Sequence, residues 1–301
     1  MKLTTLKNGW TVKIEDVDLN NLTDEEVNII GCLVGTRAVV VIKNQEHLTV
    51  EQEVKFLKRF GTPAADNPNV KSVVIDNSER ILRRVSGQKD KDGVHIGMFP
   101  LTKELHWHAD AIEDPDRKPV LYLRGVSGVK GSVTNFTNHS IVWNSLNPIF
   151  KTKLEQMNLQ VLHEHDQTGR WDQTMLDLYG TTVRKSMYKS EADLPYLIHK
   201  NQFGTEGLFL SFLQFGKFVG MSIEDSKTLL EKLKYTITHT KNVRYKHEWE
   251  DGDVVLADQW LGIHKRNEFE HIEKRMLHRA TLDYSNIDVS FKETALNLLE
   301  V

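Results

Sequence analysis

Two imidazoles and one carboxylate stand out among the residues of this chain that could do chemistry. His106, His108 and Asp110 occupy alternate positions in LHWHAD, residues 105–110. In an extended strand, side chains two residues apart share one face at about 6.5 to 7 Å, so His108 and Asp110 could reach one metal ion. His106 would lie about 13 Å from Asp110, too far to join them with ligand bonds of roughly 2.1 Å. The alternative is an ordinary polar strand that carries a chance His-x-Asp triplet.

A second group of polar residues lies far along the chain. We expect a strand that ends near His264, and then a strand in RMLHRATLDY in which Arg275, Leu277 and Arg279 share one face. Arginines directed toward an apolar interior would need anions to compensate their charge. The alternative is an edge strand whose arginines face solvent.

A further candidate site lies in VLHEHD, where His163 and His165 share one face of an expected strand. The pair could form a second metal site, although a polar strand end is the simpler interpretation. Cys32 is the only cysteine, so no intrachain disulfide can form and a cysteine zinc site is excluded. Any metal must therefore be held by His, Asp or Glu.

The composition is that of a globular protein and limits the classes of partner. The chain has 301 residues, 39% of them hydrophobic, with 39 Lys and Arg against 42 Asp and Glu. Neither a basic stripe nor an acidic tail points to nucleic acid or an anionic membrane. We expect a small-molecule partner, and the sequence is compatible with a homo-oligomer. The first residues carry no secretion signal and no apolar run could span a bilayer, so we expect a cytoplasmic protein.

Short alternating elements must position these residues. Thr23 and Thr49 are expected to begin two helices, on either side of a buried strand at about residues 38–43. A short strand is expected in SVVID, residues 72–76, and several more from residue 105 onward. Strands on both sides of a helical insert, at about residues 138–190, suggest that distant strands pair in a sandwich or barrel. No Pro-, Gly- or Ser-rich linker divides the chain, so residues 1–301 are expected to form one domain.

The ordered set of candidate residues resembles the taurine dioxygenase (TauD/TfdA) family of Fe(II)- and 2-oxoglutarate-dependent oxygenases. His108-x-Asp110 is followed by His264, by Arg275 eleven residues later and by Arg279 four residues after that. The similarity covers most of the chain, in GTRAVVVIKNQEHLTVEQEVKFLKRFGTPA, LHWHAD, LPYLIHKNQFGTEGLFLSF, and GDVVLADQWLGIHKR through RMLHRATLDY.

The resemblance implies a mainly β fold, with a double-stranded β-helix (jelly-roll) core and flanking helices. It implies that His108, Asp110 and His264 are the catalytic iron ligands, in the facial arrangement of non-haem Fe(II) oxygenases. Arg275 would bind the far carboxylate of 2-oxoglutarate. The hydroxyl of Thr134 would assist it, within GSVT where many members carry Gly-Gly-Asp-Thr.

The reaction implied by the resemblance is oxidation of a small molecule by O₂, with 2-oxoglutarate converted to succinate and CO₂. Asp110 favours hydroxylation, because halogenating members of the superfamily carry a small residue there. Arg279 matches the position that meets the anion in sulfonate-using relatives, which implies an acidic substrate. Against taurine itself, Glu104 stands four residues before His108, where those relatives carry an amide, and its charge would repel a sulfonate.

Two other functions fit parts of the pattern. A zinc hydrolase on a similar barrel could use the same three ligands, but hydrolysis needs neither 2-oxoglutarate nor Arg275. A non-catalytic binding protein could keep the fold after losing turnover. Nothing in a mere scaffold requires His108, Asp110, His264 and Arg275 together, so the oxygenase is the favoured hypothesis.

Overall fold

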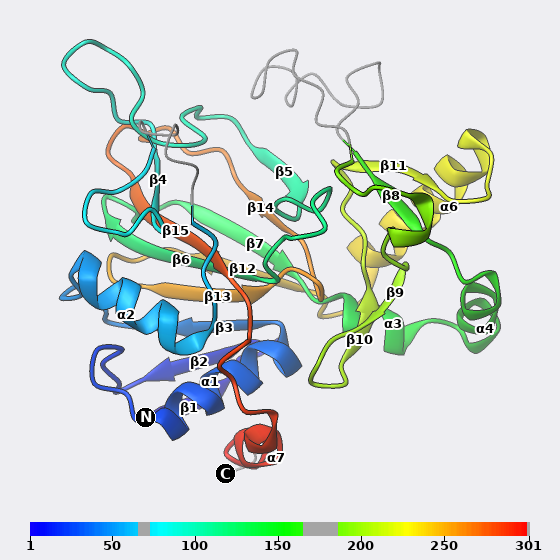
Figure 1. Ribbon diagram of the computed structural model, residues 1–301, viewed down its shortest axis with the longest axis horizontal. Coiled ribbons are helices and arrows are strands. Elements are labelled where there is room, and N and C mark those ends of the chain that lie inside the picture. The colour runs from blue at the N-terminus through cyan, green and yellow to red at the C-terminus, as the bar shows by residue number, and fades with distance from the viewer. Residues whose placement is uncertain (66–72, 165–185, 300–301) are drawn as a thin grey trace.

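The larger of the two main β-sheets has seven strands and carries helices on its outer face. The computed structural model describes residues 1–65, 73–164 and 186–299 (Figure 1). Neighbouring strands of this sheet are antiparallel except for the parallel pair β2 and β3. In spatial order they are β1 (Lys2–Thr5), β2 (Val12–Glu15), β3 (Val39–Ile42), β13 (Val254–Asp258), β6 (Val120–Ser127), β15 (Met276–Leu282) and β4 (Arg83–Ser86).

A smaller antiparallel sheet packs against the inner face of the first. In spatial order its strands are β12 (Arg244–Glu248), β7 (Val133–Thr137), β14 (His264–Arg266) and β5 (Leu105–His108). Leu121, Leu123 and Leu277 of the larger sheet share one hydrophobic core with Phe136 of β7. Strands that are distant in sequence therefore pair and close a sandwich, the layout of a jelly roll.

Helices cover the outer face of the larger sheet (Figure 1). They are α1 (Asp24–Arg37), α2 (Val50–Phe60) and the C-terminal α7 (Lys292–Asn297), which is preceded by the 3-10 turn η2 (Val289–Phe291). Thr23 and Thr49 begin α1 and α2 with complete capping boxes, which confirms the predicted helix starts. β3 between them confirms the predicted buried strand, since all four of its residues are buried.

A second part of the molecule has its own hydrophobic core, which contains Trp143, Leu154, Phe218 and Leu233. Its strands form the two-stranded sheets β10-β9 and β11-β8. The expected helical insert falls partly here, but its residues 165–185 lie outside the described residues. The elements of this part are α3 (His139–Ser145), α4 (Pro148–Met157), β8 (Val161–His163), η1 (Glu191–Asp193), β9 (Ile198–Lys200), β10 (Glu206–Leu208), β11 (Phe215–Phe218) and α6 (Ile223–His239).

Two strand boundaries and one short strand differ from the sequence-based expectation. β5 ends at His108, because the backbone N–H of Asp110 donates to the side chain of Gln259 instead of to a neighbouring strand. β14 begins at His264, where the sequence suggested that a strand ends. The short strand expected in SVVID is wrong for the described residues 73–76, which make only an isolated bridge between Val74 and Arg83.

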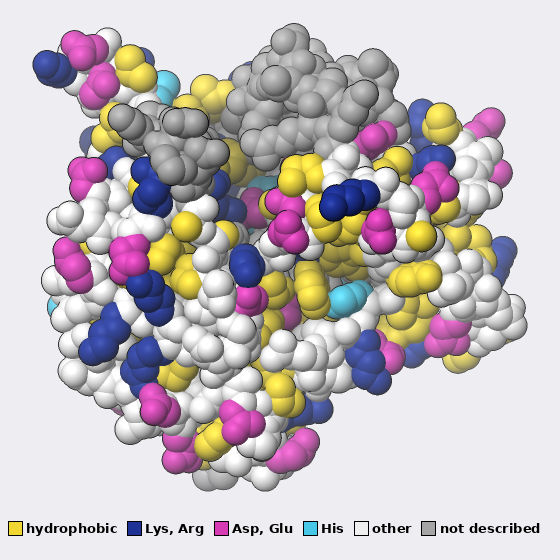
Figure 2. Space-filling model, in the orientation of Figure 1, with side chains coloured by type: hydrophobic (Ala, Val, Ile, Leu, Met, Phe, Trp, Pro, Cys, Tyr) yellow, Lys and Arg dark blue, Asp and Glu magenta, His cyan; other side chains and the backbone are white. Residues whose placement is uncertain are grey.

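The surface gives no sign of a membrane-spanning element among the described residues. None of the helices in those ranges is long and apolar enough to cross a bilayer. On the face in Figure 2, acidic and basic side chains are interspersed, and the surface is hollowed between the sheet sandwich and the second part. Charge on that face is mixed rather than gathered into a single-sign patch.

Candidate metal centre

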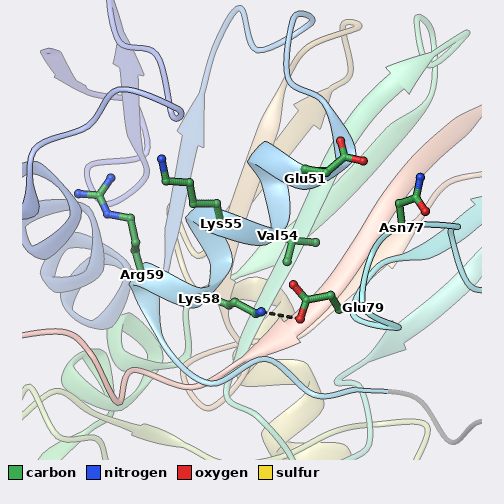
Figure 3. Close-up of a pocket in the computed structure, with 7 residues that line it drawn as sticks. All are labelled: Glu51, Val54, Lys55, Lys58, Arg59, Asn77 and Glu79. Atoms are coloured by element: carbon green, nitrogen blue, oxygen red, sulfur yellow. Dashed lines mark hydrogen bonds and ion pairs between the residues drawn. The ribbon is translucent and has the colours of Figure 1, made fainter.

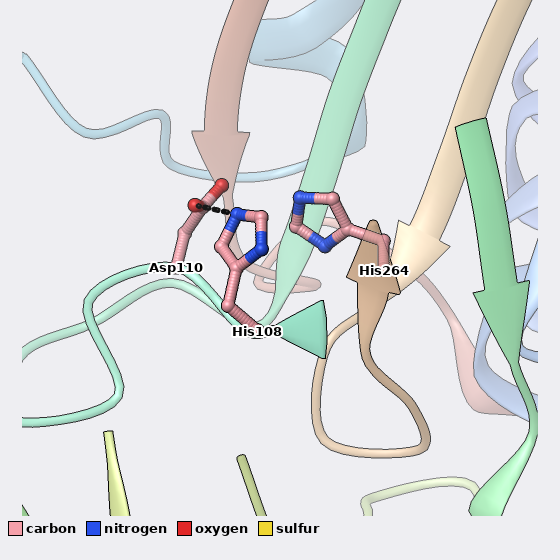
Figure 4. Close-up of side chains that lie close together, drawn as sticks. All are labelled: His108, Asp110 and His264. Carbon is pink, nitrogen blue, oxygen red and sulfur yellow. Dashed lines mark ion pairs between the residues drawn. The ribbon is translucent and has the colours of Figure 1, made fainter. Parts of the chain in front are cut away.

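The two candidate histidines lie opposite each other on adjacent strands of the smaller sheet. His108 ends β5 and His264 begins β14, and the two residues are direct partners in the antiparallel register. Asp110 lies two residues beyond the end of β5. One ligand atom from each side chain lies within 4.8 Å of the others, so the three groups could hold one metal ion (Figure 4).

The hydrogen bonds of His108 fix which ring nitrogen is available. Its Nδ1 lies 2.7 Å from the backbone oxygen of His106, so Nδ1 carries the proton and donates it. Its Nε2 is buried without a hydrogen-bond partner and lies 3.6 Å from Oδ1 of Asp110. A bound cation would give this buried nitrogen the partner that it lacks.

The protonation states of the three side chains suit a divalent cation. Desolvation by burial lowers the pKa of His108, and it lowers the pKa of His264 to about 3 with a further contribution from His108. Burial alone would raise the pKa of Asp110, but Arg279, then His264 and His108, outweigh it and hold that pKa well below 3.8. At neutral pH the site therefore presents two neutral imidazoles and one carboxylate.

Arg279 contacts Asp110 rather than an open part of the site. Its Nε and Nη2 lie 3.1 and 2.6 Å from Oδ2 of Asp110. Arg279 is 7% exposed, and β15 lies between β6 and β4, so the alternative of a solvent-facing edge strand is wrong. The residue expected to meet a substrate anion thus already has an anionic partner within the chain.

Arg275 immediately precedes β15, and its buried guanidinium lines a cavity that also contains His108, Asp110, His264 and Arg279. It is 2% exposed, its Nε donates to Oγ of Ser132 at 3.3 Å, and its Nη1 has no hydrogen-bond partner. Desolvation lowers its pKa to about 9, with a further contribution from the neighbouring Arg266. No carboxylate within the described ranges forms an ion pair with it, so an incoming anion would relieve the cost of its burial.

Thr134 lies in β7 beside these arginines and lines the same cavity. Its Oγ1 accepts a hydrogen bond of 2.9 Å from Nε1 of Trp249, which leaves the hydroxyl hydrogen available to donate. Leu121, Leu123 and Leu277 form apolar walls of the cavity. The cavity can therefore offer an anion two kinds of donor, a guanidinium and a hydroxyl, between apolar walls.

Two further polar residues, one that lines the cavity and one bonded to Arg275, were not identified from the sequence. Arg266 lines it and donates to the carbonyl oxygens of Phe99, Leu101 and Lys103. Its position two residues after His264 on a strand could have indicated that the two side chains share a face. Ser132, which contacts Arg275, carried no comparable signal in the sequence.

Glu104 lies beside the site but its charge is already compensated. Lys265 and His106 each lie 2.9 Å from one of its carboxylate oxygens. Glu104 is also absent from the residues that line the cavity. Glu104 therefore exerts little repulsion on a sulfonate in the cavity.

The described residues give no second group of three potential metal ligands. His163 is fully buried, and neither ring nitrogen has a hydrogen-bond partner. Its ring centroid lies 5.4 Å from that of Phe209, with the two rings nearly perpendicular. His165, its expected partner in a second metal site, lies outside the described residues.

Another recess lies on the outer side of α2, away from the sandwich interior (Figure 3). Its cationic side chains are largely matched by acids: Lys58 lies 2.5 Å from Glu79, and Arg59 lies 2.7 Å from Asp24. Such exposed pairs contribute little and point to no particular ligand. The cavity between the two sheets remains the better candidate for chemistry.

The family follows from a comparison of the whole chain with known proteins. The model of the taurine catabolism dioxygenase TauD, TfdA family matches residues 2–281. The chain belongs to this family. The family resemblance of the sequence is thereby confirmed, together with the class of enzyme, an Fe(II)- and 2-oxoglutarate-dependent dioxygenase.

Individual TauD/TfdA relatives are distant but cover most of the chain. The (S)-phenoxypropionate/alpha-ketoglutarate-dioxygenase of Sphingobium herbicidovorans is 24% identical over 242 residues, 80% of each chain. The alpha-ketoglutarate-dependent 2,4-dichlorophenoxyacetate dioxygenase of Cupriavidus pinatubonensis is 24% identical over 280 residues, 89% of this chain and 92% of the relative.

A solved TauD/TfdA-type structure confirms the jelly-roll fold expected from the sequence. The crystal structure of AAD-2 in complex with Mn(II) and N-oxalylglycine superposes with a TM-score of 0.71. The two chains are 22% identical, and the match covers 94% of this chain and 97% of the other.

Proposed function

We propose that His108, Asp110 and His264 hold Fe(II), and that Arg275 and Thr134 bind the far carboxylate of 2-oxoglutarate. The observation that carries this proposal is the meeting of three ligand atoms within 4.8 Å, in a cavity that also contains a buried guanidinium without an acidic partner in the described ranges. Two imidazoles and one carboxylate with open positions are the donor set of non-haem Fe(II) oxygenases.

The reaction proposed is hydroxylation of a C–H bond. Bound Fe(II), with 2-oxoglutarate and O₂, would supply the oxidant, and succinate and CO₂ would be released. The chain would contribute two charge-assisted hydrogen bonds from Arg275 to a carboxylate, and apolar walls that exclude water. Asp110 occupies the position that a halide would need, which supports hydroxylation over halogenation.

We further propose a small acidic molecule as the substrate, converted within one catalytic domain, residues 1–301. Relatives named for phenoxypropionate and 2,4-dichlorophenoxyacetate support a carboxylic acid. Arg266, Arg275 and Arg279 all line the cavity and give it an excess of cationic groups, which favours anions.

Anaerobic addition of Fe(II) and 2-oxoglutarate tests the site. The chelate should give the weak visible charge-transfer band, and His108→Ala and His264→Ala should each abolish it. Arg275→Met should keep the band but require roughly 10- to 100-fold more 2-oxoglutarate, since a bidentate charged contact is lost. Small carboxylic, sulfonic and sulfate acids can then be screened by their perturbation of the band.

His106→Ala is the matched control, because His106 lies on the same strand two residues before His108 and outside the cavity lining. Its band should match that of the wild type. A band that survives in both His108→Ala and His264→Ala would show that the iron binds elsewhere.

A further inference from the structure

We propose that Arg279 holds Asp110 to metal binding through a single carboxylate oxygen, and so keeps three coordination positions open. This inference rests on the proposed function. It makes Arg279 a positioning residue that acts through Asp110, in place of the substrate contact that the sequence suggested.

The two oxygens of Asp110 have different surroundings. Oδ2 accepts hydrogen bonds from both Nε and Nη2 of Arg279, at 3.1 and 2.6 Å. Oδ1 faces the site, 3.6 Å from Nε2 of His108. One oxygen is therefore occupied by the guanidinium while the other is directed toward the imidazoles.

Hydrogen bonds hold the backbone at Asp110 in place. Its N–H donates to Oε1 of Gln259 at 2.6 Å. The preceding Ala109 is held on both sides, since its N–H donates to Ser211 at 3.2 Å and its carbonyl oxygen accepts from Gln214 at 2.9 Å. All three bonds are buried or nearly so, and together they fix the backbone from which the carboxylate extends, while Arg279 orients the carboxylate itself.

The backbone of Arg279 is held by strand pairing within the larger sheet. Its backbone pairs with Leu123 of β6 and with Arg83 of β4, in the interior of the larger sheet. Two donors on one planar guanidinium define the orientation of the bound oxygen better than a single point charge would. The contact between Asp110 and Arg279 thus connects the segment after β5 to the larger sheet across the cavity.

The consequence concerns the number of open coordination positions. A carboxylate can bind a metal through one oxygen or through both. With one oxygen bound, two imidazoles and a carboxylate leave about three of six octahedral positions open. With both bound, about two positions remain, and 2-oxoglutarate would fill both and leave none for O₂.

An acidic substrate that took the Nε and Nη2 donors of Arg279 would displace Asp110 from them, whereas one that used Nη1 would leave that contact in place. Displacement would free Oδ2 and invite binding through both oxygens, at the moment when O₂ needs a position. A substrate contact through Nε and Nη2 is therefore opposed to the positioning role, and an experiment can test that role by itself.

The test counts the exchangeable water molecules on Mn(II) bound to the protein without 2-oxoglutarate, by field-dependent water-proton relaxation. The wild type should hold about three waters and Arg279→Met about two. Arg279→Lys, which retains a cationic donor, should restore the third. Metal affinity alone would not show whether Arg279 orients Asp110. Loss of its positive charge should raise the affinity for Mn(II), whereas loss of the orientation of Asp110 should lower it.

Arg275→Met is the matched control, because Arg275 immediately precedes the same strand, lines the same cavity and is not bonded to Asp110. It should keep about three waters while 2-oxoglutarate binding weakens. If Arg279→Met does not fold, as judged by circular dichroism, Arg279→Leu, which also lacks a donor, replaces it, and about two waters are again expected.

Three waters in the folded Arg279 variants would overturn this inference and leave the proposed iron site intact. A wild type that binds neither Mn(II) nor Fe(II) would overturn both. Two waters already in the wild type would also overturn it, because Asp110 would then bind through both oxygens despite Arg279.

Discussion

In this site, the side chain of Asp110 is bonded to Arg279, a partner that is far away in sequence. The His-x-Asp spacing was enough to select His108 and Asp110 as a possible pair, because the pattern is local. Arg279 lies 169 residues from Asp110, and the contact between them depends on how the two sheets face each other. Spacing therefore predicts which residues could bind a metal, while only the fold shows what holds them in place.

Thr134 offers a test at this scale. Thr134→Val should weaken 2-oxoglutarate binding by roughly 2- to 10-fold, since one neutral hydrogen bond contributes about 0.5–1.5 kcal/mol. It should also leave Nε1 of Trp249 without its acceptor. Titration of the visible band with 2-oxoglutarate measures the change.

Thr134→Ser is the control, because it keeps the hydroxyl and removes only a methyl group. Its affinity should stay close to that of the wild type. Equal affinities for Thr134→Val and the wild type would remove Thr134 from the co-substrate site.

Among the elements, β14 is the least visible in the sequence and the most important for the site. It has only three residues, yet it lies between β7 and β5 and carries both His264 and Arg266. Gly262 allows this close approach, because an added Cβ would lie 2.0 Å from the carbonyl oxygen of Thr137. Longer apolar strands such as β6 and β13 could be predicted from their composition, whereas β14 is defined by its neighbours.

The packing of α2 on the sheet depends on a buried acid that hydrophobic periodicity overlooks. Glu53 is fully buried and forms an ion pair with Nε of Arg124. Its two carboxylate oxygens lie 3.0 and 2.9 Å from Nδ1 of His278. Glu53→Gln keeps the shape but leaves the guanidinium of Arg124 uncompensated. The free energy of unfolding should fall by about 3–5 kcal/mol, as measured by urea denaturation.

Glu51→Gln is the matched control, since Glu51 is exposed on the same helix. It should change the free energy of unfolding by about 0.5 kcal/mol or less. Equal stabilities for the two variants would show that the buried cluster contributes nothing beyond a surface charge.

At the scale of the whole molecule, the sequence located the sheet segments and the family but not the way in which the two parts meet. His163 illustrates the difference. VLHEHD suggested a metal site or a polar strand end, yet His163 lies in the interior against Phe209. Burial of a polar residue depends on the surface that covers it, and alternation along one strand does not predict that surface.

This burial predicts sensitivity to acid. Desolvation lowers the pKa of His163 from 6.5 to about 3, with a further contribution from Arg117. Because the folded pKa is the lower one, the stabilisation is present above pH 6.5 and is lost as the pH falls from 6.5 toward 3. Relative to His163→Leu, the wild type should lose about 2 kcal/mol of unfolding free energy between pH 7 and pH 5.

Urea denaturation at the two pH values measures this difference. His271→Leu serves as the control, since His271 is largely exposed, and it should follow the pH dependence of the wild type. A wild type and a His163→Leu variant with parallel pH profiles would contradict the prediction.

The two halves of the proposed chemistry lie on opposite leaves of the sandwich: His108 and His264 belong to the smaller sheet, and Arg275 flanks a strand of the larger one. If the two sheets separate, Arg275 would move away from the metal site while His108 and His264, which lie on one sheet, stay together. Mild denaturant or heat should therefore erode affinity for 2-oxoglutarate before it erodes affinity for iron. Catalytic activity would then be lost when the two sheets separate, before the chain unfolds.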